Sequence, residues 1–214
     1  SLETKKKNSL KISGELNISE SGALEGTIKK SYGGYRARGQ RVKYWEEGED
    51  DYIDNQIANS NFELSDVTVE NGKEYSAPFV QKLTLSSAEG AEKMGDLIYL
   101  DPMLLGTQGE NPFKLKERKY PVIYSTKQEV VYYMNIAIPE GFQVDELPEP
   151  IAMALPGGAG SYRMQVSVQG DKVNVLSKFN INKKMFVQNE YEVLKKFYNQ
   201  MIAAQDSQIV LKKI

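Results

Sequence analysis

Residues 166–175 read VSVQGDKVNV, and this stretch decides the fold class of the chain. Valines alternate with polar residues on both sides of Gly170 and Asp171, which is the pattern of two half-buried strands joined by a two-residue turn. Glycine at the first central position is typical of a type II′ turn. A loop of this length pairs the four valines across one face: Val168 with Val173, and Val166 with Val175. The stretch therefore predicts an antiparallel β-hairpin.

The same period of two recurs in earlier parts of the chain. Residues 10–18 and 24–32 carry apolar side chains at alternating positions on either side of a turn at residues 20–22, which predicts a long opening hairpin. Residues 130–138 are apolar on one face and only slightly more polar on the other, so we expect a central strand with substantial burial on both sides. Weaker strand patterns cover residues 62–70, 79–86, 96–100 and 208–213.

Residues 190–204 carry the stronger of two helical patterns. Leu194 and Tyr198 belong to an apolar stripe at helical spacing, and such a stripe can pack on a sheet. Asn189 is the expected N-cap, with Glu192 at the third helical position as in a capping box.

A helical insertion is expected near residues 35–59, with a break at Gly48. Tyr35, Val42 and Trp45 fall near one face of this insertion.

Residues 102–121 contain three prolines and few periodic cues, so we expect the boundary between two lobes here. The N-terminal β-rich lobe would cover residues 8–101, with the helical insertion, and the C-terminal β-rich lobe residues 122–214, with the helix 190–204. One continuous domain is the alternative. The expected fold class is mainly β (α+β), with antiparallel sheets in a sandwich-like arrangement and a C-terminal helix packed on a sheet.

The composition excludes several kinds of chemistry. The 214 residues include neither Cys nor His, so this chain alone offers no thiolate nucleophile, no imidazole base and no Cys or His ligand for a metal. A formal net charge of −2 gives no overall basic field for nucleic acid. No stretch approaches the roughly 18 apolar residues of a membrane span.

Two charge clusters flank Gly48 within the helical insertion. We interpret the acidic run at residues 46–54 as a solvated helix start, and cation binding by this run is left open. The basic cluster just upstream is expected to pair with these carboxylates rather than to bind nucleic acid. The acidic run consists of Glu46, Glu47, Glu49, Asp50, Asp51 and Asp54, and the basic cluster of Arg36, Arg38, Arg41 and Lys43.

The remaining candidate sites have simpler interpretations. The glycine-rich residues 156–160 are expected to form a surface loop, because no Lys-Ser/Thr pair or strong helix start follows them as in a phosphate cradle. Asp145, Glu146 and Glu149 cluster in one proline-bounded segment and are expected to face solvent rather than to form a glycosidase pair. We therefore predict no catalytic, cofactor-binding or metal-binding residue and no cofactor.

Four short signatures, in this order, resemble a bacterial family of unknown function. They are Gly34-Tyr35-Arg36-Ala37 with Arg41; Asn111-Pro112-Phe113 with Arg118, Tyr120, Pro121 and Val122; Ile138-Pro139-Glu140-Gly141-Phe142 leading to Leu147-Pro148; and Tyr191, Leu194, Phe197 and Tyr198 followed by residues 209–213. Members of that family form the β-rich C-terminal region of large exported proteins, directly after a transglutaminase-like domain. The resemblance implies an upstream domain with a Cys-His-Asp triad, and a periplasmic or cell-surface location. We interpret the start of the chain, SLETKKK, as the cut edge of a longer protein.

The function expected from this resemblance is that of a non-catalytic accessory domain, which supports or orients the upstream transglutaminase-like or protease-like domain. The alternative is an independent β-sandwich module that binds cell-surface glycan or protein, and the third is a hydrolase that uses carboxylates or a metal. An apolar patch with a polar rim near Ser1 or residues 101–121 would favour docking to a neighbouring domain. Coplanar exposed aromatic rings would favour glycan, and two inward carboxylates in a closed cleft would favour the enzyme.

Overall fold

The computed structural model describes residues 7–106 and 109–214. Strands account for 45% of the chain and helices for 21%, so the chain is mainly β, as its alternating pattern predicts. Residues 1–6, most of the expected cut edge, lie outside the described residues, as do residues 107–108 of the expected connection.

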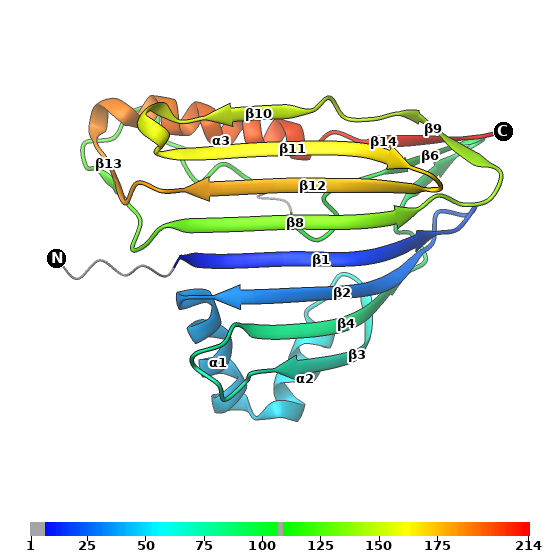
Figure 1. The fold of residues 1–214 in the computed structure, drawn as a ribbon, viewed down its shortest axis with the longest axis horizontal. Helices are drawn as coiled ribbons and strands as arrows, with labels where there is room; N and C mark the ends of the chain where they lie inside the picture. The colour runs from blue at the N-terminus through cyan, green and yellow to red at the C-terminus, as the bar shows by residue number, and fades with distance from the viewer. Residues whose placement is uncertain (1–6, 107–108) are drawn as a thin grey trace.

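Eight strands form one large sheet in the order β10-β11-β12-β8-β1-β2-β4-β3 (Figure 1). Neighbouring strands are antiparallel except β1 and β8, which run parallel. The strands are β1 (Asn8–Ile18), β2 (Leu24–Gly33), β3 (Glu63–Glu70), β4 (Phe79–Ser87), β8 (Gln128–Ala137), β10 (Ile151–Ala154), β11 (Gly160–Gln169) and β12 (Lys172–Ile181).

Both hairpins predicted from alternation are confirmed. Strands β11 and β12 pair Val168 with Val173 and Val166 with Val175, as the two-residue turn requires. Gly170 has a φ of 64°, the left-handed value that the first central position of a type II′ turn needs. The opening hairpin of β1 and β2 pairs residues 9–18 with residues 24–33.

The pairing of β1 with β8 joins the first and second halves of the chain in the middle of the large sheet. Such a pairing cannot be read from local periodicity, because more than 100 residues separate the two strands. The predicted lobes at 8–101 and 122–214 share this sheet, and their division into folding units stays a prediction.

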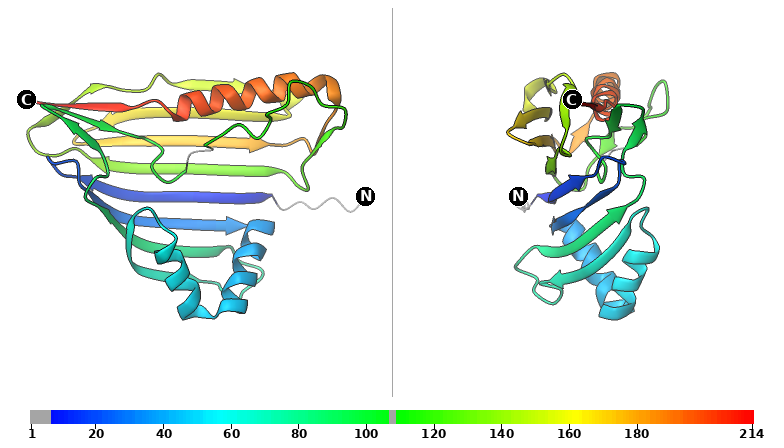
Figure 2. Two further views of the ribbon diagram at one scale, coloured as in Figure 1. Left: turned by 180° about the vertical axis from the view of Figure 1, so that it is seen from behind. Right: turned by 90° about the vertical axis from the view of Figure 1, so that its right-hand side faces the viewer.

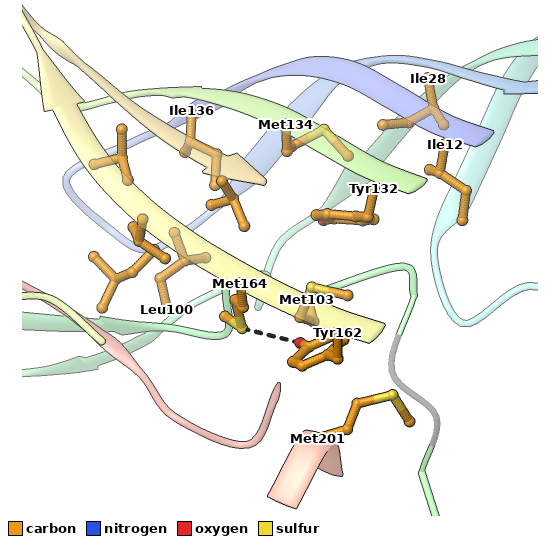
Figure 3. Close-up of a cluster of buried hydrophobic side chains, with 14 of the residues drawn as sticks. Ile12, Ile28, Leu100, Met103, Tyr132, Met134, Ile136, Tyr162, Met164 and Met201 are labelled. Carbon is orange, nitrogen blue, oxygen red and sulfur yellow. Dashed lines mark hydrogen bonds between the residues drawn. The ribbon is translucent and has the colours of Figure 1, made fainter. Parts of the chain in front are cut away.

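A second layer covers one face of the large sheet (Figure 2). It consists of helix α3 (Tyr191–Gln205) and a four-stranded sheet in the order β5-β6-β14-β9. Figure 3 shows side chains of the large sheet, among them Tyr132, Met134 and Met164, gathered with Leu100 and Met201 of the second layer. Burial of these apolar side chains is the main stabilising contribution. The small sheet contains β5 (Glu92–Met94), β6 (Leu97–Leu100), β9 (Phe142–Glu146) and β14 (Ile209–Lys213).

Helices α1 (Tyr35–Glu47) and α2 (Glu49–Ala58) cover the β2-β4-β3 end of the same face, and the predicted break at Gly48 is confirmed. They enclose a smaller core in which Tyr44, Tyr52 and Phe79 meet edge to face. In the part of the chain that the structure describes, helices α1, α2 and α3 and the small sheet lie on one face, so the other face of the large sheet is open to solvent. The remaining elements are the ribbon of β7 (Val122–Ile123) with β13 (Met185–Phe186) and the short turns η1 (Pro156–Gly158) and η2 (Gln188–Glu190).

The substantial burial expected on both sides of the strand over 130–138 is confirmed for one face and holds only in part for the other, where Val131, Asn135 and Ala137 are half-buried. Tyr132, Met134 and Ile136 are buried, whereas Tyr133, on the other face, is 42% exposed. The second layer covers only one face of β8, so its opposite face keeps contact with solvent.

The expected N-cap of the C-terminal helix is wrong. The turn η2 precedes α3, and Glu190 accepts a hydrogen bond from the Val187 backbone N–H at 2.9 Å and pairs with Lys183. The extra turn moves the helix start to Tyr191, so neither Asn189 nor Glu192 caps it.

The face of α1 that packs on the sheet differs from the apolar face of the sequence pattern. Tyr35, Val42 and Trp45 are 55%, 37% and 42% exposed. The buried side chains are those of Ala37, Arg41 and Tyr44. Arg41 is a charged residue and would be expected on the exposed face, yet its side chain can be buried because backbone carbonyls accept its hydrogen bonds.

Candidate interaction surface

The acidic run surrounds the start of α2. Its six carboxylate residues are all exposed. Glu49, Asp50 and Asp51 occupy the first turn of α2, where their negative charges interact favourably with the positive end of the helix dipole. Within residues 7–106 and 109–214, no group of three or more carboxylates is placed to hold a metal ion. The whole run is solvated, and the interpretation as a helix start is confirmed for Glu49, Asp50 and Asp51; Glu46 and Glu47 instead end α1 and Asp54 lies within α2.

The basic cluster does not pair with these carboxylates as expected. Arg41 is 3% exposed and donates to three backbone carbonyls, those of Asn71, Glu74 and Ala77. Its guanidinium also lies 5.8 Å from the ring centre of Tyr75. A guanidinium has five N–H donors in a fixed fork, so it can bind several carbonyls of one loop at once. Arg41 therefore holds the loop 71–77 against α1.

Trp45 and Tyr75 are exposed and lie in contact, with ring centres 5.0 Å apart. Their planes meet at 75°, so they form a corner rather than a flat stacking platform. Most of the other tyrosines near the core are buried, as strand and helix positions predict. This arrangement does not favour the glycan alternative.

The other candidate segments are surface structure. Residues 156–160 turn the chain from β10 into β11, with Gly157 and Gly158 in left-handed conformations. Asp145, Glu146 and Glu149 are exposed on β9 and the loop that follows it. Both observations agree with the interpretation as surface loop and solvent-facing charge.

One end of the molecule carries a group of exposed apolar side chains, here called the apolar end patch. Its core is the ribbon of β7 and β13, in which Ile123 pairs with Met185. Their neighbours Val122 and Phe186 point inward and are buried, so the ribbon has one buried side and one bare apolar side. The name covers these ribbon side chains together with the exposed apolar residues of the segments that lead into the ribbon or border the start of α3. These residues are Leu115, Tyr120, Ile123, Met185, Val187 and Val193, each between 42% and 77% exposed.

A polar groove of about 600 Å³ borders the patch. One of its walls is the segment 116–118 and the other is formed by η2 and the first turn of α3, with Val187 between them. Glu192 in this groove pairs with Lys196 at 2.7 Å, and the Lys196 ammonium lowers the pKa of this carboxyl. A carboxyl with a lowered pKa is ionised at neutral pH and does not suit the role of a general acid.

The residues that line the groove are mostly charged or amide side chains, so the patch has an apolar centre with a polar rim.

Helix α3 fixes the segment that carries the patch. Asn111 donates to the Lys195 carbonyl at 2.9 Å and to Asn199 Oδ1 at 2.6 Å. Phe113 packs edge to face on Tyr191 and Tyr198 at 5.8 and 5.0 Å between ring centres. The Tyr191 hydroxyl and the Lys195 ammonium both donate to the Leu115 carbonyl, each at 2.9 Å. The connection thus has a defined position beside the helix.

The ribbon itself is anchored from behind by tyrosines. The hydroxyls of Tyr124 and Tyr198 lie 3.1 Å apart, and Tyr124 packs on Phe186. Burial raises the pKa of Tyr198, so its hydroxyl keeps its proton and its hydrogen bond at neutral pH. These contacts behind the ribbon hold its apolar side chains in a position where they remain exposed to solvent.

The patch lies at the end of the molecule where β1 begins (Figure 1). The Asn8 backbone N–H donates to the Lys127 carbonyl at 2.8 Å, directly beyond the ribbon strand β7, and Lys7 pairs with Glu129 at 2.9 Å. Sequence reasoning missed the patch because residues 120–123 and 185–187 are too short to show a period.

A family model described as a domain of unknown function with a solved structure (DUF3858) matches residues 96–211, more than half of the chain. The chain belongs to the DUF3858 family. The match covers the connection, the ribbon, α3 and β14 as far as Leu211, and so includes the whole apolar end patch.

Among solved structures, this DUF3858 protein is similar to one described as "a putative protease from Parabacteroides distasonis ATCC 8503". The two are 10% identical with a TM-score of 0.46, and the similarity covers 96% of this chain and 27% of the other. The chain thus spans about a quarter of that protein's length. No curated protein matches the sequence. In the described part of the chain, no helix is both long and apolar enough to cross a membrane.

Proposed function

We propose that this DUF3858 chain is a non-catalytic accessory domain that docks through the apolar end patch onto the domain preceding it in a longer protein. The observation that carries the proposal is the patch itself, with its bare apolar ribbon and polar rim beside residues 101–121. Monomeric proteins rarely expose large contiguous apolar patches, and those that do commonly use them for association.

The place of the patch supports this choice of partner. The chain enters the sheet at Asn8, next to the loop that leaves the ribbon, so a preceding domain would emerge beside the patch. A partner linked in this way needs little affinity per contact, because the linker gives it a high effective concentration.

The composition supports an accessory role. A chain without Cys or His supplies neither the nucleophile nor the base of a thiol triad. In this proposal the preceding domain is transglutaminase-like or protease-like, as the four signatures in the sequence suggest, and provides the reactive groups. The proposal extends to an exported protein that functions in the periplasm or at the cell surface.

The test uses the longer protein with the surface substitutions Ile123→Ser and Met185→Ser together. Both side chains are exposed, so the fold of this domain should persist while the contact with the neighbour weakens. The expected result is faster limited proteolysis between the domains and a lower melting temperature or turnover of the neighbour. The control is Val168→Ser, which removes an apolar side chain about as exposed as Met185 from the hairpin at the other end of the large sheet. Identical behaviour of the double variant and the control would reject the docking surface.

A further inference from the structure

A second pocket, independent of the apolar end patch, lies between the helical pair and the inner face of the large sheet. It has a volume of about 460 Å³, within the usual range of small-molecule sites. We call it the Lys30 pocket. Its lining residues are Lys30, Lys43, Glu47, Asn55, Gln56, Asn59, Ser60, Leu64 and Leu83.

Lys30 is an unusual residue for its place in the sheet. In β2 it lies opposite Ile12 of β1 and Gln81 of β4, both of which are buried on the inner face. Alternation therefore turns the Lys30 side chain inward, beneath α1 and α2, where it is half-buried. The alternating pattern Leu24, Ile28, Tyr32 in the sequence already contains this lysine at an inward position.

The Lys30 ammonium has no anionic partner. Among the described residues no carboxylate lies within ion-pair distance of it, although seven other ion pairs are present. Burial accordingly lowers the pKa of Lys30. A partly desolvated ammonium without a counter-ion is costly, and an anion that enters the pocket would remove that cost.

The rest of the lining favours an anion with further hydrogen-bonding groups. Lys43 adds a second ammonium, and Glu47, the only carboxylate of the lining, accepts a hydrogen bond from Asn55 at 3.2 Å. Gln56 accepts from Gln81 and Ser60 accepts from a backbone N–H. The Gln56 amide NH2 and the Ser60 hydroxyl can still donate hydrogen bonds to a ligand. Leu64 and Leu83 provide an apolar floor.

We propose that the Lys30 pocket binds a small anionic ligand, whose carboxylate or phosphate group sits between Lys30 and Lys43. The pocket opens between helices α1 and α2 and the sheet, far along the sheet from the ribbon of β7 and β13, so this site is separate from the docking surface.

The experiment is a titration of the chain with two probes, inorganic phosphate and glucuronate, followed through backbone amide NMR shifts. The expected result is saturable shifts at residues of the Lys30 pocket with one or both probes, and none with glucose, which lacks the charge. Saturation by phosphate alone or by glucuronate alone identifies which anionic group the site takes.

The decisive variant is Lys30→Met, which keeps the aliphatic stem and removes the charge. Its affinity for the probe should fall by roughly tenfold or more, because hydrogen bonds to charged groups are among the strong ones. The matched control is Lys29→Met, since Lys29 precedes it on the same strand, is exposed and points to the opposite face. The melting temperature of Lys30→Met should stay equal or rise, which shows that the variant folds.

Two results would overturn the proposal. One is the absence of saturable shifts with either probe at up to roughly 50 mM, where even a weak site would fill. The other is equal probe binding by Lys30→Met and the unsubstituted chain.

Discussion

Arg41 shows at the scale of one residue how a charge can serve as a structural anchor. It is buried, but its partners are the carbonyls of Asn71, Glu74 and Ala77 rather than a carboxylate. These carbonyls lie in the loop 71–77, where no helix or strand supplies regular hydrogen-bond donors for them. Its place in the first sequence signature therefore has a structural explanation.

We predict that Arg41→Met destabilises the chain by about 2–4 kcal/mol, because it removes three hydrogen bonds donated by a buried, charged side chain. Arg41→Lys should recover only part of this loss, since an ammonium cannot reach three carbonyls with the geometry of a guanidinium. Arg38→Met, an exposed substitution on the same helix, is the control and should change stability by less than about 0.5 kcal/mol. Chemical denaturation measures all three. Equal stability of Arg41→Met and Arg38→Met would contradict the anchoring role.

At the scale of elements, the connection 109–121 depends on helix α3 for its position. Asn111 binds the Lys195 carbonyl and Asn199 with its amide, and its Oδ1 accepts from the Phe113 backbone N–H at 2.8 Å. One side chain thus joins the connection to the helix and shapes the turn that places Phe113 on it. The Asn111-Pro112-Phe113 signature is explained by this junction.

We predict that Asn111→Ala loosens the connection and lowers the free energy of unfolding by about 1–3 kcal/mol, since three hydrogen bonds are lost. Hydrogen exchange at residues 111–118 should quicken before exchange in the large sheet does. Lys114→Ala, which removes only an exposed pair with Glu110, should leave both measurements unchanged. Unaltered exchange in Asn111→Ala would show that the phenylalanine alone holds the segment.

At the scale of the whole molecule, the parallel pair β1 and β8 ties the two halves together. If residues 8–101 or 122–214 were separated, each would expose one of these central strands as an open edge. The larger core also takes side chains from both halves, such as Ile28 and Met134. These facts favour the alternative of one continuous domain.

We predict a single cooperative unfolding transition for residues 8–214, seen at the same denaturant concentration by far-ultraviolet circular dichroism and by the fluorescence of Trp45. Trp45 reports on the first half, whereas most strand signal of β8, β11 and β12 comes from the second. Two separate midpoints would instead support independent lobes at the 102–121 boundary.

Much of the fold follows from local pattern. The two hairpins, the helix with its Leu194 stripe and the break at Gly48 could all be predicted, because side-chain period and turn chemistry act over a few residues. The short strands β9 and β10 were not predicted, because four or five residues next to Pro148 and Pro150 carry too little pattern. The candidate sites were less accessible, since the ribbon of Ile123 and Met185 forms only when segments far apart in the chain meet.

By itself the sequence determined that this chain is mainly β and that it offers no thiol or imidazole chemistry, since composition and alternation do not depend on long-range contacts. Tertiary structure alone decided which side of α1 faces the sheet, which strands meet in parallel, and which apolar residues stay in solvent. It also placed the Lys30 ammonium beneath two helices without a counter-ion. The physical reason is that a side chain becomes buried only when another part of the chain packs against it, and local sequence does not specify that second surface.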